Sequence, residues 1–236
     1  MGVVVVVWQA ARIPFEGSVG VSIDHARDWL ALERAVHLDV EASFIRLFHR
    51  AGLSGVASWV YFNIHLPVLF LFMASARRFA PERYPYLRAT FVLAHVPALV
   101  AIGLYPLAPP RWLPELPFAT APDLKGTLLN ATAAVVSMHV GYPIFIAAAT
   151  IWLAPRSRLA WLSVAYPLLV IALVLGTGNH YVLDAVTGAL AIGVGAAAAR
   201  VLCPGTGNFR NGRVAAETSL RSSRAGGMDS MERASP

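Results

Sequence analysis

The chain has 236 residues, of which 57% are hydrophobic and only 14% are charged. A soluble domain normally carries about 25% charged residues, so this composition excludes an ordinary soluble protein and indicates a polytopic membrane protein of one domain. The net charge of +6 does not indicate nucleic-acid binding, because the arginines lie in short runs beside apolar segments and in the C-terminal tail, without a pattern of interleaved aromatic residues. We therefore expect membrane lipids, and no nucleic acid, as partners.

The N-terminus is an apolar run of about 10 residues without a preceding basic residue, which makes it a poor secretory signal. A helix that crosses a bilayer needs roughly 20 residues. The run therefore predicts an interfacial segment or a truncated first span. The single cysteine, Cys203, excludes an internal disulfide and a zinc site with several thiolate ligands.

Residues 22–50 mix charged and apolar side chains at roughly helical spacing. This pattern predicts one or two amphipathic helices on the membrane surface, or equally a helix that covers the mouth of a bundle. Five long apolar stretches follow, at residues 55–76, 87–107, 135–154, 159–178 and 181–203. Each is about long enough to cross the hydrocarbon core as a helix.

The fold predicted from these elements is an all-α membrane bundle with five spans, or six if the N-terminus contributes one. Its expected organisation is an N-terminal apolar and amphipathic part at residues 1–54, a transmembrane catalytic domain at residues 55–203, and a cytoplasmic tail at residues 204–236. The tail is rich in Gly, Ser, Arg and Ala and lacks apolar periodicity, which predicts disorder.

Arginine placement orients the predicted bundle. Six arginines lie between the first and second long spans, or at the very start of the second, and between the third and fourth, namely Arg77, Arg78, Arg83, Arg88, Arg156 and Arg158. Loops rich in arginine are normally cytoplasmic, and the tail falls on the same side. Residues 105–134 and the connection at residues 176–180 are then extracytoplasmic, so three polar motifs converge on that face of what we expect to be the plasma membrane.

The first motif is YPLAPPRWLP at residues 105–114, where four prolines forbid a regular helix around Arg111. A guanidinium in so rigid a loop suits a bidentate contact with a phosphate or carboxylate. The alternative is a proline-rich loop whose arginine reaches the lipid headgroups.

The second motif is VSMHVGYP at residues 136–143, at the start of a span. Ser137 is placed to cap the helix or to donate to an anion, and the unpaired backbone N–H groups near Gly141 suit the same anion. His139 is a candidate general acid. A structural or interfacial histidine is the alternative.

The third motif is GTGNHYVLDAVTG at residues 176–188. His180 and Asp184 are four residues apart and share one face of a helix. If Asp184 accepts from Nδ1 of His180, Nε2 stays unprotonated and able to attack phosphorus, while Asn179 adds a donor nearby. The alternative is a polar anchor, but a paired His and Asp inside a span is usually functional.

These three motifs resemble the membrane-bound lipid phosphatases of the type 2 phosphatidic acid phosphatase superfamily, particularly its inositolphosphotransferase-like branch. Members share an arginine with proline-rich sequence, a Ser-x-His motif and a late His-x-x-x-Asp motif in this order. The resemblance covers roughly residues 55–200. It implies phosphoryl transfer without metal or cofactor, in which His180 attacks the phosphate, Asp184 orients it and His139 protonates the departing alcohol.

The same resemblance implies that Arg111, Ser137 and amides near Gly141 neutralise the phosphate oxygens. Many relatives have a lysine and an arginine where Leu104 and Val174 stand here. Candidates to replace these cations are Lys125, Asn179, Asn63 and His65, and His95 has a weaker case. For Asn63 and His65 an interhelical hydrogen bond is an equal alternative.

The function predicted from the sequence is hydrolysis of a lipid phosphate or diphosphate at the extracytoplasmic face through a phosphohistidine intermediate. One alternative is a phosphotransferase that uses an alcohol such as an inositol headgroup as the acceptor. A second alternative is a lipid or anion transporter. The position of the polar residues at one interface, away from the midplane, favours an enzyme over a transporter.

Overall fold

The computed structural model describes residues 2–15, 17–120 and 132–204. Lys125 and the predicted disorder of residues 205–236 therefore lie outside the described residues. Within the described part, the regular elements are all helices, apart from one isolated bridge between Leu107 and Ala133. This confirms the predicted all-α membrane bundle.

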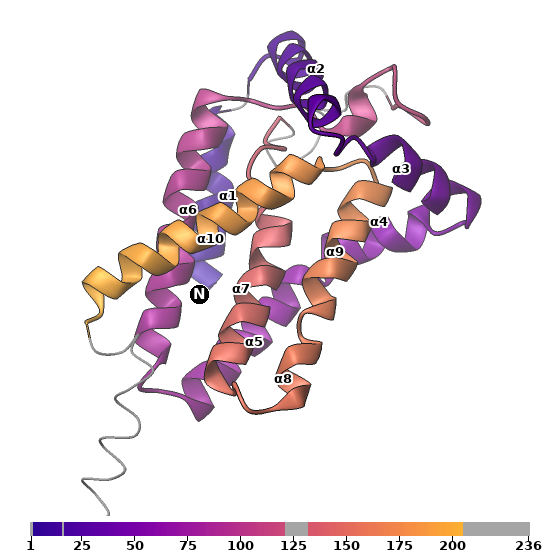
Figure 1. Cartoon of the computed structure of the whole chain (residues 1–236). Coiled ribbons are helices and arrows are strands. Elements are labelled where there is room, and N and C mark those ends of the chain that lie inside the picture. Colours follow the sequence, from indigo (N-terminus) through magenta and orange to yellow (C-terminus); the bar gives the residue numbers. More distant parts are fainter. Residues whose placement is uncertain (1, 16, 121–131, 205–236) are drawn as a thin grey trace, which may run out of the picture.

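The helices form a bundle that is covered at one end by two amphipathic helices (Figure 1). In chain order the elements are α1 (Gly2–Arg12), η1 (Ile13–Phe15), α2 (Val19–Ala35), α3 (Glu41–Arg50), α4 (Ser54–Asn63), α5 (His65–Phe79), α6 (Tyr84–Leu104), η2 (Pro110–Trp112), α7 (Met138–Leu153), α8 (Arg158–Leu162), α9 (Ala165–Gly176) and α10 (Val182–Leu202). Figure 1 shows α7 in the middle of the bundle and α10 crossing it.

Four helical segments of the described chain are long and apolar enough to cross a membrane: Ser54–Phe79, Tyr84–Leu104, Arg158–Gly176 and Val182–Leu202. The apolar helix α7 matches the remaining predicted stretch but has only 16 residues. It begins three residues later than the sequence predicts, because Val135, Val136 and Ser137 form a buried, non-helical segment in front of it. At 11 residues, α1 is below the roughly 20 residues that a crossing needs.

Prolines divide two of the spans into two helices each. Pro67 has no N–H to bond to the carbonyl of Asn63, so α4 ends there and α5 begins at His65. Pro167 separates α8 from α9 in the same way. The first break lies within a few residues of Tyr61, whose side chain reaches the centre of the bundle.

The predicted amphipathic region forms two helices, α2 and α3, which cover the end of the bundle where α9 ends and α10 begins (Figure 1). The buried stripe of α2 comprises Ser22, Ala26, Leu30 and Glu33. α3 packs against α9 so closely that a Cβ on Gly176 would lie 2.4 Å from the Phe48 ring. These contacts favour the predicted alternative in which the amphipathic helices cover the mouth of the bundle.

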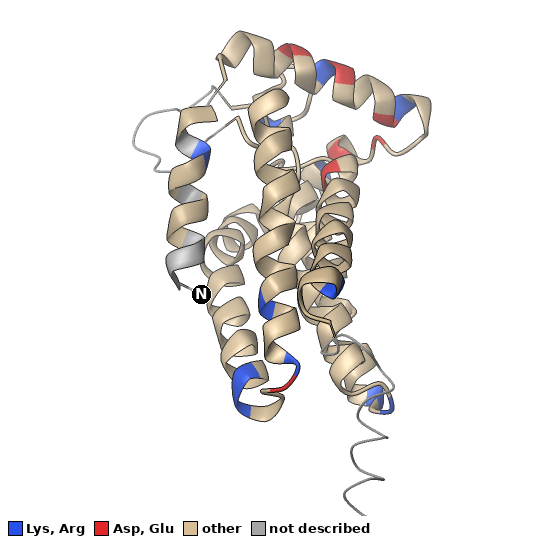
Figure 2. Ribbon diagram, turned by 90° about the vertical axis from the view of Figure 1, so that its left-hand side faces the viewer, with Lys and Arg blue, Asp and Glu red and all other residues tan. Residues whose placement is uncertain are grey.

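The two ends of the bundle differ in charge, as Figure 2 shows. Arg77 and Arg78 lie in the last turn of α5, and Arg200 lies in the last turn of α10. At the opposite end, α2 and α3 carry acidic residues and arginines together, four of each. The candidate site lies beneath this cover of mixed charge.

Candidate functional site

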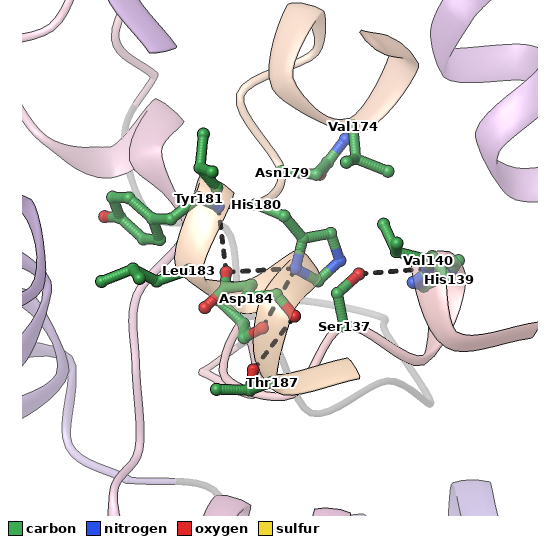
Figure 3. Close-up of polar contacts among 12 residues, drawn as sticks. Ser137, His139, Val140, Val174, Asn179, His180, Tyr181, Leu183, Asp184 and Thr187 are labelled. Atoms are coloured by element: carbon green, nitrogen blue, oxygen red, sulfur yellow. Dashed lines mark hydrogen bonds and ion pairs between the residues drawn. The ribbon is translucent and has the colours of Figure 1, made fainter. Parts of the chain in front are cut away.

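The three predicted motifs lie together in the structure because their backbones are hydrogen-bonded to one another. The N–H of Arg111 donates to the carbonyl of Gly178 at 2.9 Å, which ties the first motif to the third. The N–H of Ser137 donates to the carbonyl of Asp184 at 3.2 Å, which ties the second motif to the third. In Figure 3 the His180 ring lies between Asp184 and the start of α7. Segments about 70 residues apart thus form one site.

His180 is buried at the end of a tight turn that follows α9, with 4% of its surface exposed. Its Nδ1 lies 3.0 Å from the carbonyl oxygen of Ala134 and 3.4 Å from Oδ2 of Asp184. Both partners can only accept while Asp184 is ionised, so Nδ1 carries the ring proton and Nε2 presents a lone pair. The site therefore holds the tautomer that a nitrogen nucleophile needs.

Asp184 is fully buried in the first turn of α10 and has two roles there. Its Oδ2 accepts the N–H of Tyr181 at 3.0 Å, which completes a capping box at the start of the helix. The same oxygen lies 3.4 Å from Nδ1 of His180, farther than the Ala134 carbonyl. The predicted His180–Asp184 contact is present, but the orientation of the ring is shared with a backbone carbonyl that the sequence motif does not show.

Tyr61 of α4 joins the two candidate catalytic histidines, and the sequence analysis did not identify it. Its Oη lies 3.4 Å from Nε2 of His180 and 3.2 Å from Nδ1 of His139. Because Nε2 of His180 must accept, the single hydroxyl proton of Tyr61 points to it, and Nδ1 of His139 must then donate to Oη. The proton on His139 thus faces His180. The sequence offered one signal for Tyr61. It precedes His65 by four residues, which places both side chains on one face of the predicted span.

Ser137 and Gly141 fix the start of α7 and its distance from α10. Ser137 is fully buried, and its Oγ accepts the N–H of Val140 at 3.4 Å as an N-cap. The N–H of Gly141 is bonded to the Ser137 carbonyl at 2.9 Å, so it is already occupied within the helix. A Cβ on the facing Gly188 would lie 2.4 Å from that carbonyl oxygen. Small residues therefore let α7 and α10 approach closely at the site.

Val136 precedes this cap in an unusual backbone conformation, with a φ of +58°. β-Branched residues rarely adopt the left-handed region, because the side chain clashes with the backbone there. Such a conformation persists only where the surroundings hold it, and it is often found at functional sites. Here it turns the chain so that Ser137 reaches both α7 and Asp184.

Arg111 is positioned by η2 and by the turn at Gly178. Its Nη1 donates a hydrogen bond to Oδ1 of Asn179, and the Asn179 amide donates to Oγ1 of Thr177 at 2.7 Å. Gly178 has a φ of +63°, and a Cβ there would lie 3.1 Å from Cβ of Arg111. Burial lowers the pKa of Arg111 from its usual value, and nearby Tyr61 opposes this shift. A partly buried guanidinium is therefore held against Asn179, the residue that precedes His180.

Positions 104 and 174, where many relatives carry cations, lie in different parts of the structure. Leu104 is 78% exposed on the outside of the bundle, whereas Val174 is fully buried. The Val174 carbonyl accepts the N–H of Asn179 at 3.0 Å, and Figure 3 shows both residues near His180. Position 174 is therefore part of the site wall and position 104 is not. Lys125, a candidate replacement, lies outside the described residues.

The other predicted polar candidates separate into two groups. Asn63 is exposed and donates to the carbonyl of Trp59 at 2.8 Å, so the structure does not bring it to the site. His95 bonds the Phe91 carbonyl at 2.7 Å and the Tyr142 hydroxyl at 3.0 Å, which is a satisfied interhelical contact. His65 is buried, with its ring centroid 5.4 Å from that of His139. Only His65 of this group lies at the site.

Two buried glutamates of the cover hold the start of α10. Oε1 of Glu33 accepts the N–H of Leu183 at 2.7 Å, and Oε1 of Glu41 accepts the N–H of Val182 at 3.1 Å. Both side chains are fully buried, and burial, followed by smaller effects that include the Glu41 carboxyl, raises the pKa of Glu33 to about 9. Carboxyl oxygens at a helix N-terminus satisfy N–H groups that have no partner within the helix.

These glutamates were missed because acidic residues on an amphipathic helix normally face solvent. The available signal was that Glu33 is spaced 3, 7 and 11 residues after Leu30, Ala26 and Ser22, which places it on the apolar stripe. The cover is therefore connected by hydrogen bonds to the helix that follows His180.

The site combines a nitrogen lone pair, a facing proton donor and a guanidinium. This set suits attack on an electrophilic centre that bears anionic oxygens, such as phosphorus. Among the described residues, no group of three or more His, Cys, Asp and Glu side chains is placed to hold a metal ion. The arrangement of His180, His139 and Arg111 supports acid–base and nucleophilic chemistry by side chains.

Comparison with known families agrees with this geometry. A family model described as the PAP2 superfamily matches residues 27–198, which is more than half of the chain and includes all three motifs. No significant match was found among curated proteins or among solved structures. Membership of this superfamily supports an activity of the phosphatase or phosphotransferase type. On the family match, and in agreement with its motifs and helical bundle, the chain belongs to the PAP2 superfamily.

Proposed function

We propose that the protein is an integral membrane lipid phosphatase that hydrolyses a lipid phosphate or diphosphate through a phosphohistidine intermediate. One observation carries the proposal: Nε2 of His180 presents a lone pair toward Nδ1–H of His139, with only the Tyr61 hydroxyl between them. The two ring centroids are 5.6 Å apart. A phosphoryl group in place of the hydroxyl would have a nucleophile on one side and an acid on the other.

In the first step, Nε2 of His180 attacks phosphorus and an N–P bond forms while the bond from phosphorus to the lipid oxygen breaks. His139 in its doubly protonated form gives its Nδ1 proton to that oxygen, so the lipid leaves as a neutral alcohol. Asp184 and the Ala134 carbonyl accept from Nδ1 of His180, which stabilises the positive charge on the phosphorylated ring.

In the second step, a water molecule attacks phosphorus and gives its proton to His139, which now acts as the base. The N–P bond breaks, inorganic phosphate leaves, and His180 recovers its lone pair. Each group has thus returned to its starting protonation state. No metal ion takes part in this proposal, because the proton transfers and the charge stabilisation are assigned to side chains.

Arg111 is the proposed partner of the negatively charged phosphate oxygens, with Ser137 and Asn179 as further donors. Nη1 of Arg111 donates to Oδ1 of Asn179, so the two side chains are held together at the proposed phosphate position. A preorganised donor at such a position typically contributes a factor of about 10²–10³ to the rate. The amide of Gly141 is less suited, since it is bonded within α7.

The lipid substrate and the membrane side are parts of the same proposal. A site buried inside an apolar bundle suits a substrate with hydrocarbon tails that enters between helices. The arginines at the opposite end of the bundle support an extracytoplasmic site in the plasma membrane, because arginine-rich loops normally remain in the cytoplasm.

A phosphotransferase related to the inositolphosphotransferase-like branch is the second candidate. It differs only in the acceptor, since an alcohol would replace water in the second step. The observation that favours it is that, among the described residues, the ring nitrogens of His65 and the buried hydroxyl of Tyr166 have no hydrogen-bond partner. His65 lies against His139, and Tyr166 lies against His65.

Purified protein in detergent tests the proposal with a panel of prenyl diphosphates, phosphatidic acid and phosphatidylglycerol phosphate. We expect phosphate release or transfer with at least one lipid, inhibition by vanadate, insensitivity to chelators, and loss of activity in His180→Ala and His139→Ala. Arg27→Ala, an exposed change on α2, is the matched control. Activity that survives both histidine changes, or that chelators abolish, would overturn the mechanism, and the absence of any turnover would favour a transporter.

A further inference from the structure

Two polar groups near His139, the buried His65 ring and the buried hydroxyl of the half-buried Tyr166, have no role in the chemistry described so far. Only 3% of the His65 surface is exposed, and within the described chain neither ring nitrogen has a hydrogen-bond partner. The same holds for the hydroxyl of Tyr166, whose oxygen is buried. Buried polar groups are nearly always paired, so unpaired ones call for a ligand or an ordered water.

The two side chains form a continuous row with the general acid. The ring centroids of His139 and His65 are 5.4 Å apart, and those of His65 and Tyr166 are 6.5 Å apart. The three residues come from α7, α5 and α9, and His65 opens α5 directly after the break at Ile64. The row therefore starts at the group that exchanges a proton with the alcohol or water.

Donor and acceptor capacity indicates which ligand fits. A neutral imidazole has one donor and one acceptor, and a phenol hydroxyl can also donate and accept. A phosphate dianion offers acceptors only, so it would use half of this capacity, whereas a hydroxyl group both donates and accepts. Arg111, which lies in the loop of the first motif, is already the proposed charged donor for the phosphate.

We propose that His65 and Tyr166 form a subsite that binds the hydroxyl-bearing acceptor of the phosphoryl group. This inference rests on the proposed function. The acceptor hydroxyl lies between His139 and His65, its oxygen forms the new bond to phosphorus, its proton passes to His139, and the N–P bond to His180 breaks. The acceptor is water or an alcohol, and an alcohol with further hydroxyl groups would also reach Tyr166.

The rates at which the phosphohistidine intermediate forms and is discharged test this proposal. The protein, in detergent, is mixed with a ³²P-labelled lipid phosphate, and glycerol is added as the acceptor alcohol. Tyr166→Phe removes only the hydroxyl, His65→Leu removes both ring nitrogens, and His65→Gln keeps a donor and an acceptor. The control is Tyr86→Phe. Tyr86 is a buried tyrosine whose hydroxyl donates to the Ala196 carbonyl, away from the catalytic histidines.

We expect Tyr166→Phe and His65→Leu to form phosphohistidine at the wild-type rate but to discharge it about tenfold more slowly, which corresponds to the loss of one or two hydrogen bonds. His65→Gln should restore part of the discharge rate, and Tyr86→Phe should match wild type. Slower formation of phosphoglycerol identifies an alcohol as the acceptor, and slower phosphate release without any phosphoglycerol identifies water.

Unchanged discharge in both variants would overturn the subsite. Slower formation of phosphohistidine in both variants would also overturn it, since His65 and Tyr166 would then act on the phosphate or on the fold. Wild-type protein that forms no phosphohistidine at all contradicts the proposed function itself, so the two failures are distinguishable.

Discussion

The hydroxyl of Tyr61 lies 3.4 Å from Nε2 of His180, the atom to which the phosphoryl group is assigned. The same hydroxyl lies 3.2 Å from Nδ1 of His139, so it occupies the space between the proposed nucleophile and the proposed acid. Substrate binding must break the bond to Nε2 before phosphorus can approach. Tyr61 lies three residues before the break at Ile64, where α4 gives way to α5.

Tyr61→Phe removes the competing bond to His180 and also the acceptor that orients His139. We expect vanadate to inhibit the variant about fivefold more tightly, since one net hydrogen bond of about 1 kcal/mol no longer has to be broken. The kcat should fall, because the His139 ring is held less firmly. Inhibition curves and steady-state kinetics on the same preparation separate the two effects. Weaker vanadate inhibition in the variant would show that the hydroxyl binds the phosphate directly.

Arg111→Ala should lower kcat/KM by about 100-fold, since it removes a charged donor from the phosphate oxygens. Arg111→Lys should recover part of this loss, because lysine keeps the charge but not the planar fork of donors. Arg27→Ala on the exposed face of α2 is the control and should behave as wild type. Kinetics with the best lipid of the panel measure the effect, and equal losses in the Lys and Ala variants would show that charge alone is insufficient.

Gly188→Ala tests the close approach of α7 and α10. The added Cβ would lie 2.4 Å from the Ser137 carbonyl oxygen, so the helices must separate and the Ser137–Asp184 backbone bond must lengthen. We expect a loss of stability of about 1–3 kcal/mol together with reduced activity. Gly193→Ala is the matched control on the same helix, because an added Cβ there meets nothing within 4 Å. Thermal unfolding in detergent that is equal for the two variants would contradict this packing.

Glu33 gives the stability of the fold a pH dependence. Burial is the main cause that raises its pKa to about 9 from 4.5, so the native state keeps a proton that the unfolded chain loses. The contribution to stability is complete below about pH 4.5 and is lost as the pH rises to about 9.

Glu33→Gln keeps an acceptor for the Leu183 N–H but cannot ionise beside Glu41 and Asp184. We expect the melting temperature of wild type, relative to this variant, to fall between these two pH values and to level off above them. Glu82→Gln in the α5–α6 turn, where the side chain is 70% exposed, is the control. A constant difference between wild type and Glu33→Gln across this range would contradict the assignment.

The spans were predictable from sequence because hydrocarbon permits only long apolar helices. The three motifs could be assigned to one face because arginine-rich loops fix the topology independently of the motifs. Pro67 and Pro167 also indicate where two of the spans are divided into separate helices. The apolar residues alone predict one continuous helix for each of these spans. The short length of α7 was not predictable, since Val135 and Val136 are as apolar as a helix would require.

The side chains that complete the site were harder to predict. Tyr61 lies in an apolar span, where a tyrosine is ordinary, and its role follows only from the tertiary contacts of its hydroxyl with His139 and His180. Glu33 and Glu41 lie on amphipathic helices, and only tertiary contacts show that they cap α10. The Ala134 carbonyl that binds His180 is invisible to any side-chain motif.

The most direct measurement is the identity of the phosphorylated atom after a labelled lipid phosphate is mixed with the protein and quenched in alkali. The account predicts label on His180 at Nε2, since Nδ1 is committed to Ala134 and Asp184. The label should be absent in His180→Ala. Label on His139, on a carboxylate or at Nδ1 of His180, or turnover without any covalent intermediate, would contradict the account.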